Sequence, residues 1–84
     1  MFDIELSHTA EKELRRLPKR RQMQLIGALE MLSEDPYSGK PLQGELKGLW
    51  SLCVWPYRII YKIDKGILTI VVIAIKHRQG AYKK

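Results

Sequence analysis

The chain has 84 residues, of which 45% are hydrophobic and 29% are charged. This length and composition indicate one small globular domain over residues 1–84 and exclude an intrinsically disordered chain. The 15 Lys and Arg residues outnumber the 9 Asp and Glu residues, which gives a net charge of +6. The positive charge favours nucleic acid, the ribosome or an acidic protein segment as partner, although a generically basic soluble surface would have the same composition.

The cysteine content and the apolar segments restrict the cellular setting. The single cysteine, Cys53, excludes an internal disulfide framework and fits a reducing cytoplasm. We expect no signal peptide, because the chain starts with a strand-like run that contains Asp3 and Glu5. The apolar stretch at residues 67–75 falls well short of the roughly 20 residues that span a bilayer. These features predict a cytoplasmic protein that does not engage a membrane.

The first part of the chain predicts one strand and two helices. Apolar residues alternate with acidic ones in residues 2–6, which is typical of a half-buried strand at or near a sheet edge. Ser7 is a good N-cap for a first helix, and Pro18 separates this helix from a second one that runs to about Glu34. In the second helix, Gly27 either weakens the helix or allows a close helix crossing. The apolar stripe of the second helix consists of Leu25, Ala28, Leu29 and Leu32.

The second part of the chain predicts a loop followed by three strands. Proline and glycine punctuate residues 35–46 (DPYSGKPLQGEL), and strands are expected at residues 49–54, 57–63 and 67–75. The last strand is apolar apart from Thr69, so we expect it to be central and covered on both faces. The predicted fold is α+β: a helical hairpin packed on one face of a small antiparallel sheet, in the order β-α-α-β-β-β.

Side chains that can carry chemistry gather around the end of the last predicted strand. They are Arg58 on a neighbouring strand, Lys76, His77, Arg78, Tyr82, Lys83 and Lys84. Such cationic groups bind and polarise a phosphodiester. An RNA substrate brings its own nucleophile, the 2′-hydroxyl, so this chemistry requires alignment, charge neutralisation and proton transfer but no metal or other cofactor. His77 is the member of the group that titrates near neutral pH, which makes it the expected base or acid.

Each of these residues also has a purely structural interpretation. Arg58 could pair with a carboxylate, His77 could end the strand, and Tyr82 could anchor the C-terminus as an apolar side chain. A second basic cluster at the bend between the helices, which includes Arg20 and Arg21, is either a solvated surface or a phosphate-contacting one. The sequence contains no metal-ligand spacing, glycine-rich phosphate loop or nucleophile elbow.

Five segments together resemble a known family. They are residues 7–18, 34–39 (EDPYSG), 46–50 (LKGLW), 56–61 (PYRIIY) and 75–82 (IKHRQGAY). In these segments, and over nearly its whole length, the chain resembles the RelE/ParE toxin superfamily of type II toxin–antitoxin systems. The Lys-His-Arg…Tyr ending is more similar to the RelE/StbE ribosome-dependent mRNA interferases than to the ParE branch, which poisons DNA gyrase.

The resemblance implies a toxin that cleaves mRNA in the ribosomal A site. It implies a cognate acidic antitoxin that wraps the toxin, with operator DNA contacted only through that antitoxin. It also implies residue roles: Arg58 stabilises the phosphate, Arg78 is the general acid, and Tyr82 orients or stacks on the substrate.

One departure from the family pattern affects the expected site. The resemblance implies two basic residues on the strand before the Tyr-Arg motif, where this chain has Ser51 and Cys53. Their loss removes phosphate contacts and a candidate base. Either His77 serves as the base, activity is weak, or the protein acts on another target, such as gyrase, or only binds its antitoxin.

Overall fold

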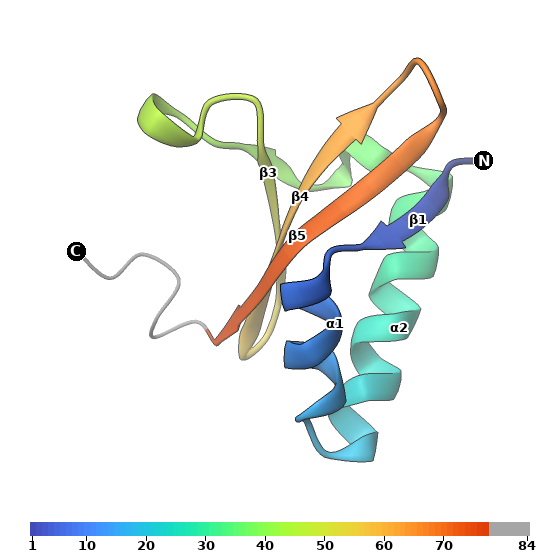
Figure 1. Ribbon diagram of the computed structural model, residues 1–84, viewed down its shortest axis with the longest axis vertical. Helices are drawn as coiled ribbons and strands as arrows, with labels where there is room; N and C mark the ends of the chain where they lie inside the picture. Colours follow the sequence, from blue (N-terminus) through green and yellow to red (C-terminus); the bar gives the residue numbers. More distant parts are fainter. Residues whose placement is uncertain (78–84) are drawn as a thin grey trace.

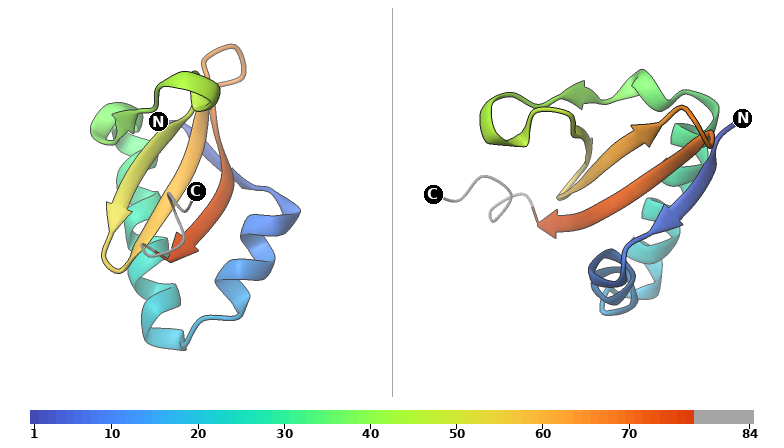
Figure 2. Two further views of the ribbon diagram at one scale, coloured as in Figure 1. Left: turned by 90° about the vertical axis from the view of Figure 1, so that its left-hand side faces the viewer. Right: turned by 45° about the horizontal axis from the view of Figure 1, so that its top comes forward.

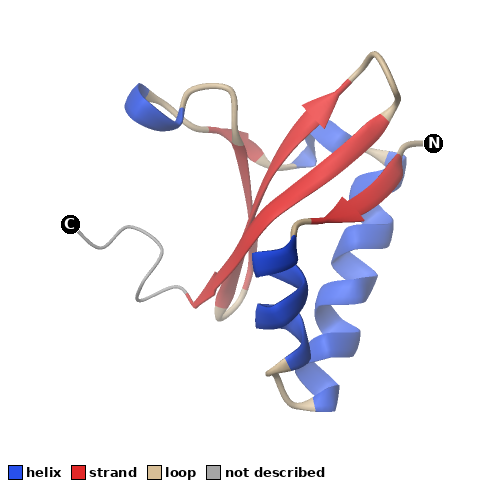
Figure 3. Ribbon diagram, in the orientation of Figure 1, coloured by secondary structure: helices blue, strands red, loops and turns tan. Residues whose placement is uncertain are grey.

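Two helices cover one face of a five-stranded sheet in the computed structural model, which describes residues 1–77 (Figure 1). In chain order the elements are β1 (Asp3–Leu6), α1 (His8–Arg15), α2 (Lys19–Glu34), η1 (Pro36–Ser38), β2 (Lys40–Pro41), η2 (Gly44–Leu46), β3 (Trp50–Val54), β4 (Tyr57–Asp64) and β5 (Thr69–His77). The strand order across the sheet is β1-β5-β4-β3-β2. The helical hairpin lies on one side of the strands, and the loop that carries η2 projects on the other side (Figure 3). The predicted α+β fold is confirmed.

The sheet is mixed, so the prediction of an entirely antiparallel sheet is wrong at one edge. β1 runs parallel to β5, with Ile4 opposite Ile70 and Leu6 opposite Val72. Figure 2 shows the two strands side by side. They are far apart in the chain, so no tight turn dictates an antiparallel direction. The pairing makes β1 an edge strand and β5 an interior strand, as the apolar patterns predicted.

The turn between β4 and β5 is longer than the predicted three residues. The Asp64 Oδ1 atom accepts hydrogen bonds from the backbone N–H groups of Gly66 and Ile67, at 3.0 and 3.4 Å. Pairing therefore starts at Thr69, directly opposite Asp64. The expected strand start at residue 67 is wrong because the Asp64 side chain keeps the following residues in the turn.

The segment between α2 and β3, expected to be an unstructured loop, contains η1, the short strand β2 and η2. β2 pairs antiparallel with β3, placing Lys40 opposite Ser51. Gly39 permits this close approach, since a Cβ atom there would lie 2.7 Å from the carbonyl oxygen of Ser51 and 2.5 Å from the Tyr61 hydroxyl. β2 has only two residues and contains Pro41, which is typical of an edge strand.

A bulge in β5 decides which side chains face the helices. Ile60 lies opposite Ala74, whereas the next residue, Tyr61, lies opposite Val72, so Ile73 is the extra residue. Its carbonyl accepts a hydrogen bond from the Ser7 hydroxyl at 2.8 Å, while the same hydroxyl oxygen accepts from the first turn of α1. Ser7 is thus the predicted N-cap, and it also fastens α1 to β5.

The core lies between the helices and the sheet. Its buried side chains are Ala10, Leu25, Leu29, Leu32, Ile59, Tyr61, Ile70, Val72 and Ile75. The predicted stripe of α2 is confirmed: Leu25, Leu29 and Leu32 are buried and Ala28 packs against them. Among the described residues, no helix is long and apolar enough to cross a membrane.

Tyr61 provides a pH-dependent contribution to folding. Its hydroxyl donates a hydrogen bond to the Pro36 carbonyl at 2.8 Å. Burial, with a smaller contribution from the charge of Asp35, raises the pKa of Tyr61 above its ordinary value of 10.0. A raised folded-state pKa means that this stabilisation is complete below pH 10 and is lost as the pH rises through the folded-state value.

We therefore expect Tyr61→Phe to cost about 1 kcal/mol of unfolding free energy at neutral pH, because the variant leaves the Pro36 carbonyl without its donor. The difference between the two proteins should shrink above pH 10, where ionisation of the unfolded tyrosine weakens only the original chain. Urea denaturation of both proteins across this pH range measures the effect. Parallel pH curves for the two proteins would contradict the assignment.

Candidate functional site

The face of the sheet away from the helices carries a groove with a volume of about 490 Å³. Figure 2 (left) looks onto this open face, with α2 behind the strands. Residues from β2, β3, β4 and the segments on either side of β2 line the groove: Ser38, Gly39, Lys40, Pro41, Leu42, Ser51, Leu52, Cys53 and Arg58. The groove therefore contains both positions where the family pattern departs, together with one predicted phosphate-binding arginine.

Arg58 lies at the centre of a row across three strands. It is opposite Cys53 on β3 and opposite Lys76 on β5. Directly opposed residues in a sheet have Cβ atoms about 4.5–5.5 Å apart, so the side chains in the row are close neighbours. Two of the predicted cations, Arg58 and Lys76, are thus brought together by strand register alone.

Glu13 of α1 positions the end of β5. One carboxylate oxygen accepts a hydrogen bond from the backbone N–H of Ile75 at 2.8 Å, and the other lies 3.7 Å from the ammonium group of Lys76. α1 therefore covers the part of the β5 edge that has no β1 residue opposite it. The Lys76 side chain is half exposed, so its pairing with Glu13 is weak and leaves the ammonium group accessible.

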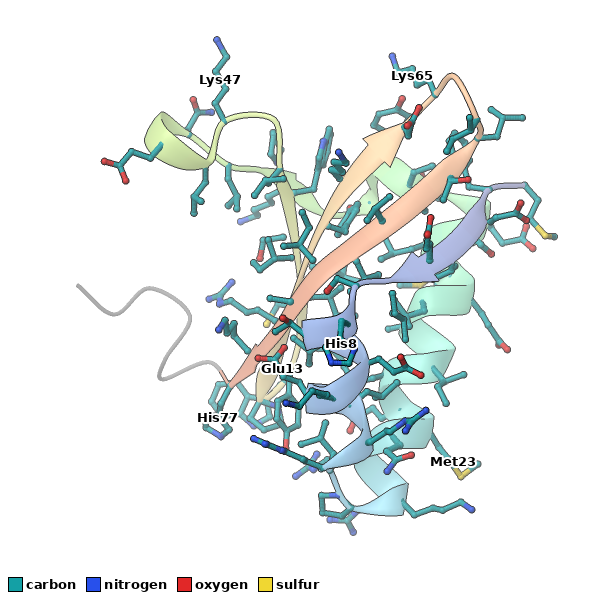
Figure 4. The ribbon with its side chains drawn as sticks, in the orientation of Figure 1. His8, Glu13, Met23, Lys47, Lys65 and His77 are labelled. Carbon is teal, nitrogen blue, oxygen red and sulfur yellow. The ribbon has the colours of Figure 1, made fainter. Side chains whose placement is uncertain are left out.

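His77 has a different environment from Arg58. It lies opposite Tyr57, and the two rings meet edge to face with centroids 5.5 Å apart. Tyr57 packs against the core, whereas Arg58 belongs to the other face of the same strand. The bulge at Ile73 explains this placement, because it shifts the alternation of β5 by one residue. Figure 4 shows His77 at the very end of β5.

The structure thus does not align His77 with Arg58 in one row, and the role of His77 in proton transfer stays a prediction. The other predicted site residues at the C-terminus, Arg78, Tyr82, Lys83 and Lys84, lie outside the described residues 1–77.

The basic residues of the helical bend form a separate surface. Arg20 and Arg21 lie in the first turn of α2, which begins at the opposite end of the molecule from η2 in Figure 1. The Arg21 guanidinium donates a hydrogen bond to the Gln24 side chain at 3.1 Å, and Arg15 pairs with Glu11 at 2.8 Å. The structure does not bring these residues to the groove.

Lys40 is a site residue that the sequence analysis missed. Its strand partner is Ser51, so the lysine belongs to the open face and lines the groove. Ser51 is only 5% exposed, and its hydroxyl has no hydrogen-bond partner among the described residues. A cation is therefore supplied beside Ser51 from the neighbouring strand. A two-residue strand with a proline has no periodicity, so only the Lys-Pro dipeptide after Gly39 could have indicated it.

No group of three or more His, Cys, Asp or Glu side chains is arranged to hold a metal ion within residues 1–77. Cys53 is an exposed free cysteine that lines the groove. The groove supplies Arg58 and Lys40, and Lys76 stands beside Arg58 on the next strand; together these cations can recognise an anion.

A helical hairpin on a five-stranded mixed sheet, with cations on the opposite face, defines a RelE-like toxin fold. A family model described as the ParE toxin of type II toxin–antitoxin system, parDE, matches residues 4–82. The chain belongs to this family, within the RelE/ParE superfamily, and is a toxin of a type II toxin–antitoxin system.

Two curated relatives come from Mycobacterium tuberculosis. Toxin RelG is 33% identical over 85 residues, covering 99% of this chain and 98% of the relative. Toxin RelE is 30% identical over 84 residues, covering 98% of this chain and 87% of the relative.

Solved structures show the same fold. The toxin–antitoxin complex RelBE2 of M. tuberculosis matches with a TM-score of 0.85 and 34% identity, covering 92% of this chain and 98% of that chain. The isolated E. coli RelE toxin matches with a TM-score of 0.81 and 21% identity, covering 98% and 89% of the two chains. The expected superfamily is confirmed.

Proposed function

We propose that this toxin is an endoribonuclease that cleaves mRNA on the ribosome and so inhibits translation. The observation that carries the proposal is the row of Arg58 and Lys76 beside a groove that also contains Lys40. The relatives named Toxin RelG and Toxin RelE, and the mRNA interferase activity that the resemblance implies, support the same activity.

The proposed reaction is a transesterification within the RNA. The 2′-oxygen attacks the adjacent phosphorus, the bond from phosphorus to the 5′-oxygen breaks, and the products carry a 2′,3′-cyclic phosphate and a 5′-hydroxyl. Negative charge develops on the non-bridging oxygens, where a bidentate guanidinium such as that of Arg58 is most effective. The proton of the 2′-hydroxyl goes to a base, for which His77 is our proposal, and Arg78 is proposed to protonate the leaving 5′-oxygen.

The groove also explains how the chain can function without basic residues at positions 51 and 53. Lys76 stands beside Arg58 on the adjacent strand β5, and Lys40 stands beside Ser51 on β2, which β3 separates from the strand of Arg58. Both lysines are point charges that neutralise phosphate without requiring a fixed geometry. We infer that they position the RNA backbone while Arg58 acts on the reacting phosphate.

Lys40→Ala should weaken binding to mRNA-programmed ribosomes and lower the slope of log K against log salt by about 1, because one phosphate contact is lost. Lys47→Ala is the matched control. It removes the same charge from a side chain that projects away from the groove (Figure 4). Equal effects of the two substitutions would show that Lys40 contributes only to the net charge.

We infer that the partner of the toxin is a cognate antitoxin with an acidic segment. The charge of +6 favours association with an acidic chain. The matching M. tuberculosis structure is a toxin–antitoxin complex, RelBE2. Contact with operator DNA is proposed only through the antitoxin, and the proposed site of action is the cytoplasm, where ribosome and mRNA meet.

A second candidate function is inhibition of DNA gyrase, favoured by Ser51 and Cys53 in place of cations and by the ParE description of the matching family. Expression of the toxin without antitoxin distinguishes the two. Cleaved transcripts with 2′,3′-cyclic phosphate ends at codon positions support the nuclease, and intact transcripts with induced DNA damage support gyrase inhibition.

A further inference from the structure

α2 has a second apolar face that is not part of the core. It consists of Met23, Ile26, Gly27 and Met31, and we call it the outward face of α2. The three large side chains are 64%, 43% and 52% exposed. At 3.6 residues per turn the four positions fall within an arc of about 140°, on the side opposite Leu25 and Leu32. Figure 4 shows Met23 pointing away from the protein.

Gly27 is at the middle of this outward face, and nothing within residues 1–77 requires a glycine there. A Cβ atom at this position would have none of the described atoms outside its own helix backbone within 4 Å. Glycine is the least favourable helix residue after proline, so a glycine in the centre of a 16-residue helix needs a reason. Close approach of another backbone from outside supplies one.

The charges on α2 are also unfavourable within a single molecule. Lys19 and Arg20 are in the first turn and Glu30 and Glu34 are near the end, with no acidic residue in the first turn and no basic residue in the last. This order opposes the helix macrodipole, whose positive end is at the N-terminus. Neither Arg20 nor Glu34 forms an ion pair within residues 1–77.

We propose that the outward face of α2 binds the same face of a second copy of this chain. The two helices run antiparallel around a twofold axis at Gly27. Met23 lies four residues before Gly27 and Met31 four residues after it. Met23 of each copy therefore lies opposite Met31 of the other copy. Arg20 lies seven residues before and Glu34 seven residues after, so the axis creates two equivalent ion pairs.

This pairing resolves the unexplained features together. Glycine against glycine lets the helix axes approach to the lower end of the usual 8–10 Å range. The basic start of each helix lies beside the acidic end of the other, and the two macrodipoles are antiparallel. A uniformly acidic antitoxin segment is less complementary, because it would meet Glu30 and Glu34 at one end of the face. A second copy has the required order of charges by symmetry.

The proposal does not depend on the catalytic assignment. Met23 of the outward face points away from the strands (Figure 4), so the dimer leaves the groove on the open face of the sheet accessible. A dimer would present two such grooves on opposite outer surfaces.

Analytical ultracentrifugation of the purified full-length chain over a concentration series tests the proposal. The protein should form a concentration-dependent dimer. Gly27→Leu should raise the dimer dissociation constant by at least about tenfold. The same variant should keep or raise the thermal midpoint of the monomer, because leucine favours the helix and the position is open. Ile67→Glu, in the exposed turn between β4 and β5, is the control and should leave the dissociation constant unchanged.

Charge reversal tests the register of the two helices. Arg20→Glu should weaken the dimer, and the double variant Arg20→Glu/Glu34→Arg should restore it, since the pairs are reformed with opposite sign. A chain that stays monomeric at all concentrations overturns the proposal. So does a dimer that is unaffected by Gly27→Leu. If instead the chain is monomeric and Gly27→Leu weakens binding of an antitoxin segment, the face belongs to the antitoxin and the proposal is wrong.

Discussion

Arg58→Ala should lower the rate of mRNA cleavage on programmed ribosomes by about 10²-fold or more, as expected when a donor to the transition state is lost. Arg58 is at the centre of the cationic row and lines the groove. Its guanidinium can bind two phosphate oxygens at once, which neither Lys40 nor Lys76 can do. The loss should therefore appear in the rate of the chemical step under single-turnover conditions, rather than only in binding.

Lys62→Ala is the matched control for Arg58→Ala. Lys62 is an exposed residue on the same strand and on the same face of the sheet as Arg58, but it does not line the groove. Its removal changes the net charge equally and should leave the single-turnover rate within a few fold. Arg58→Lys should recover part of the activity, because it keeps the charge and loses the bidentate geometry.

The thermal midpoint of each variant separates chemistry from folding, since Arg58 is half-buried and interacts with its surroundings. Arg78→Ala should reduce cleavage to a similar degree if the arginine is the general acid. Undiminished toxicity of both arginine variants, with intact transcripts and induced DNA damage, would remove the nuclease proposal in favour of gyrase inhibition.

Local sequence signals predicted the elements that depend on neighbouring residues. The cap at Ser7, the stripe on α2 and the alternation in β3 and β4 were all visible because each depends on spacing of a few residues. In the structure this alternation puts Ser51, Cys53 and Arg58 on one face, where all three line the groove. The location of the groove on the open face was therefore accessible from sequence.

The features that were missed depend on contacts between distant segments. The parallel pairing of β1 with β5 joins the two ends of the described chain. The bulge at Ile73 is held by a hydrogen bond from Ser7, which is far away in sequence. The extra residue in the bulge puts His77 on the opposite face of the sheet from Arg58. Lys40 reaches the groove only because β2 pairs with β3. None of these contacts leaves a periodic pattern in the sequence.

Leu29→Ala should reduce the free energy of unfolding by about 2–5 kcal/mol, the range for truncating a buried leucine. Leu29 is 6% exposed and lies between Leu25 and Leu32 in the core cluster. The loss combines the transfer free energy of the removed atoms with the cavity that they leave. Chemical denaturation followed by circular dichroism measures this free energy, and the transition should remain two-state in a domain of this size.

Met23→Ala is the control for Leu29→Ala, since it truncates a large apolar side chain on the opposite face of the same helix. Met23 is 64% exposed, so its removal from a dilute, monomeric sample should change the unfolding free energy by less than about 0.5 kcal/mol. Alanine is also the best helix former, which offsets the small packing loss. A cost near zero for Leu29→Ala, or equal costs for the two variants, would mean that the hairpin does not pack on the sheet through this stripe. The stability of a domain this small depends on few buried side chains, so a loss at the upper end of the range should leave a large fraction of Leu29→Ala unfolded at physiological temperature.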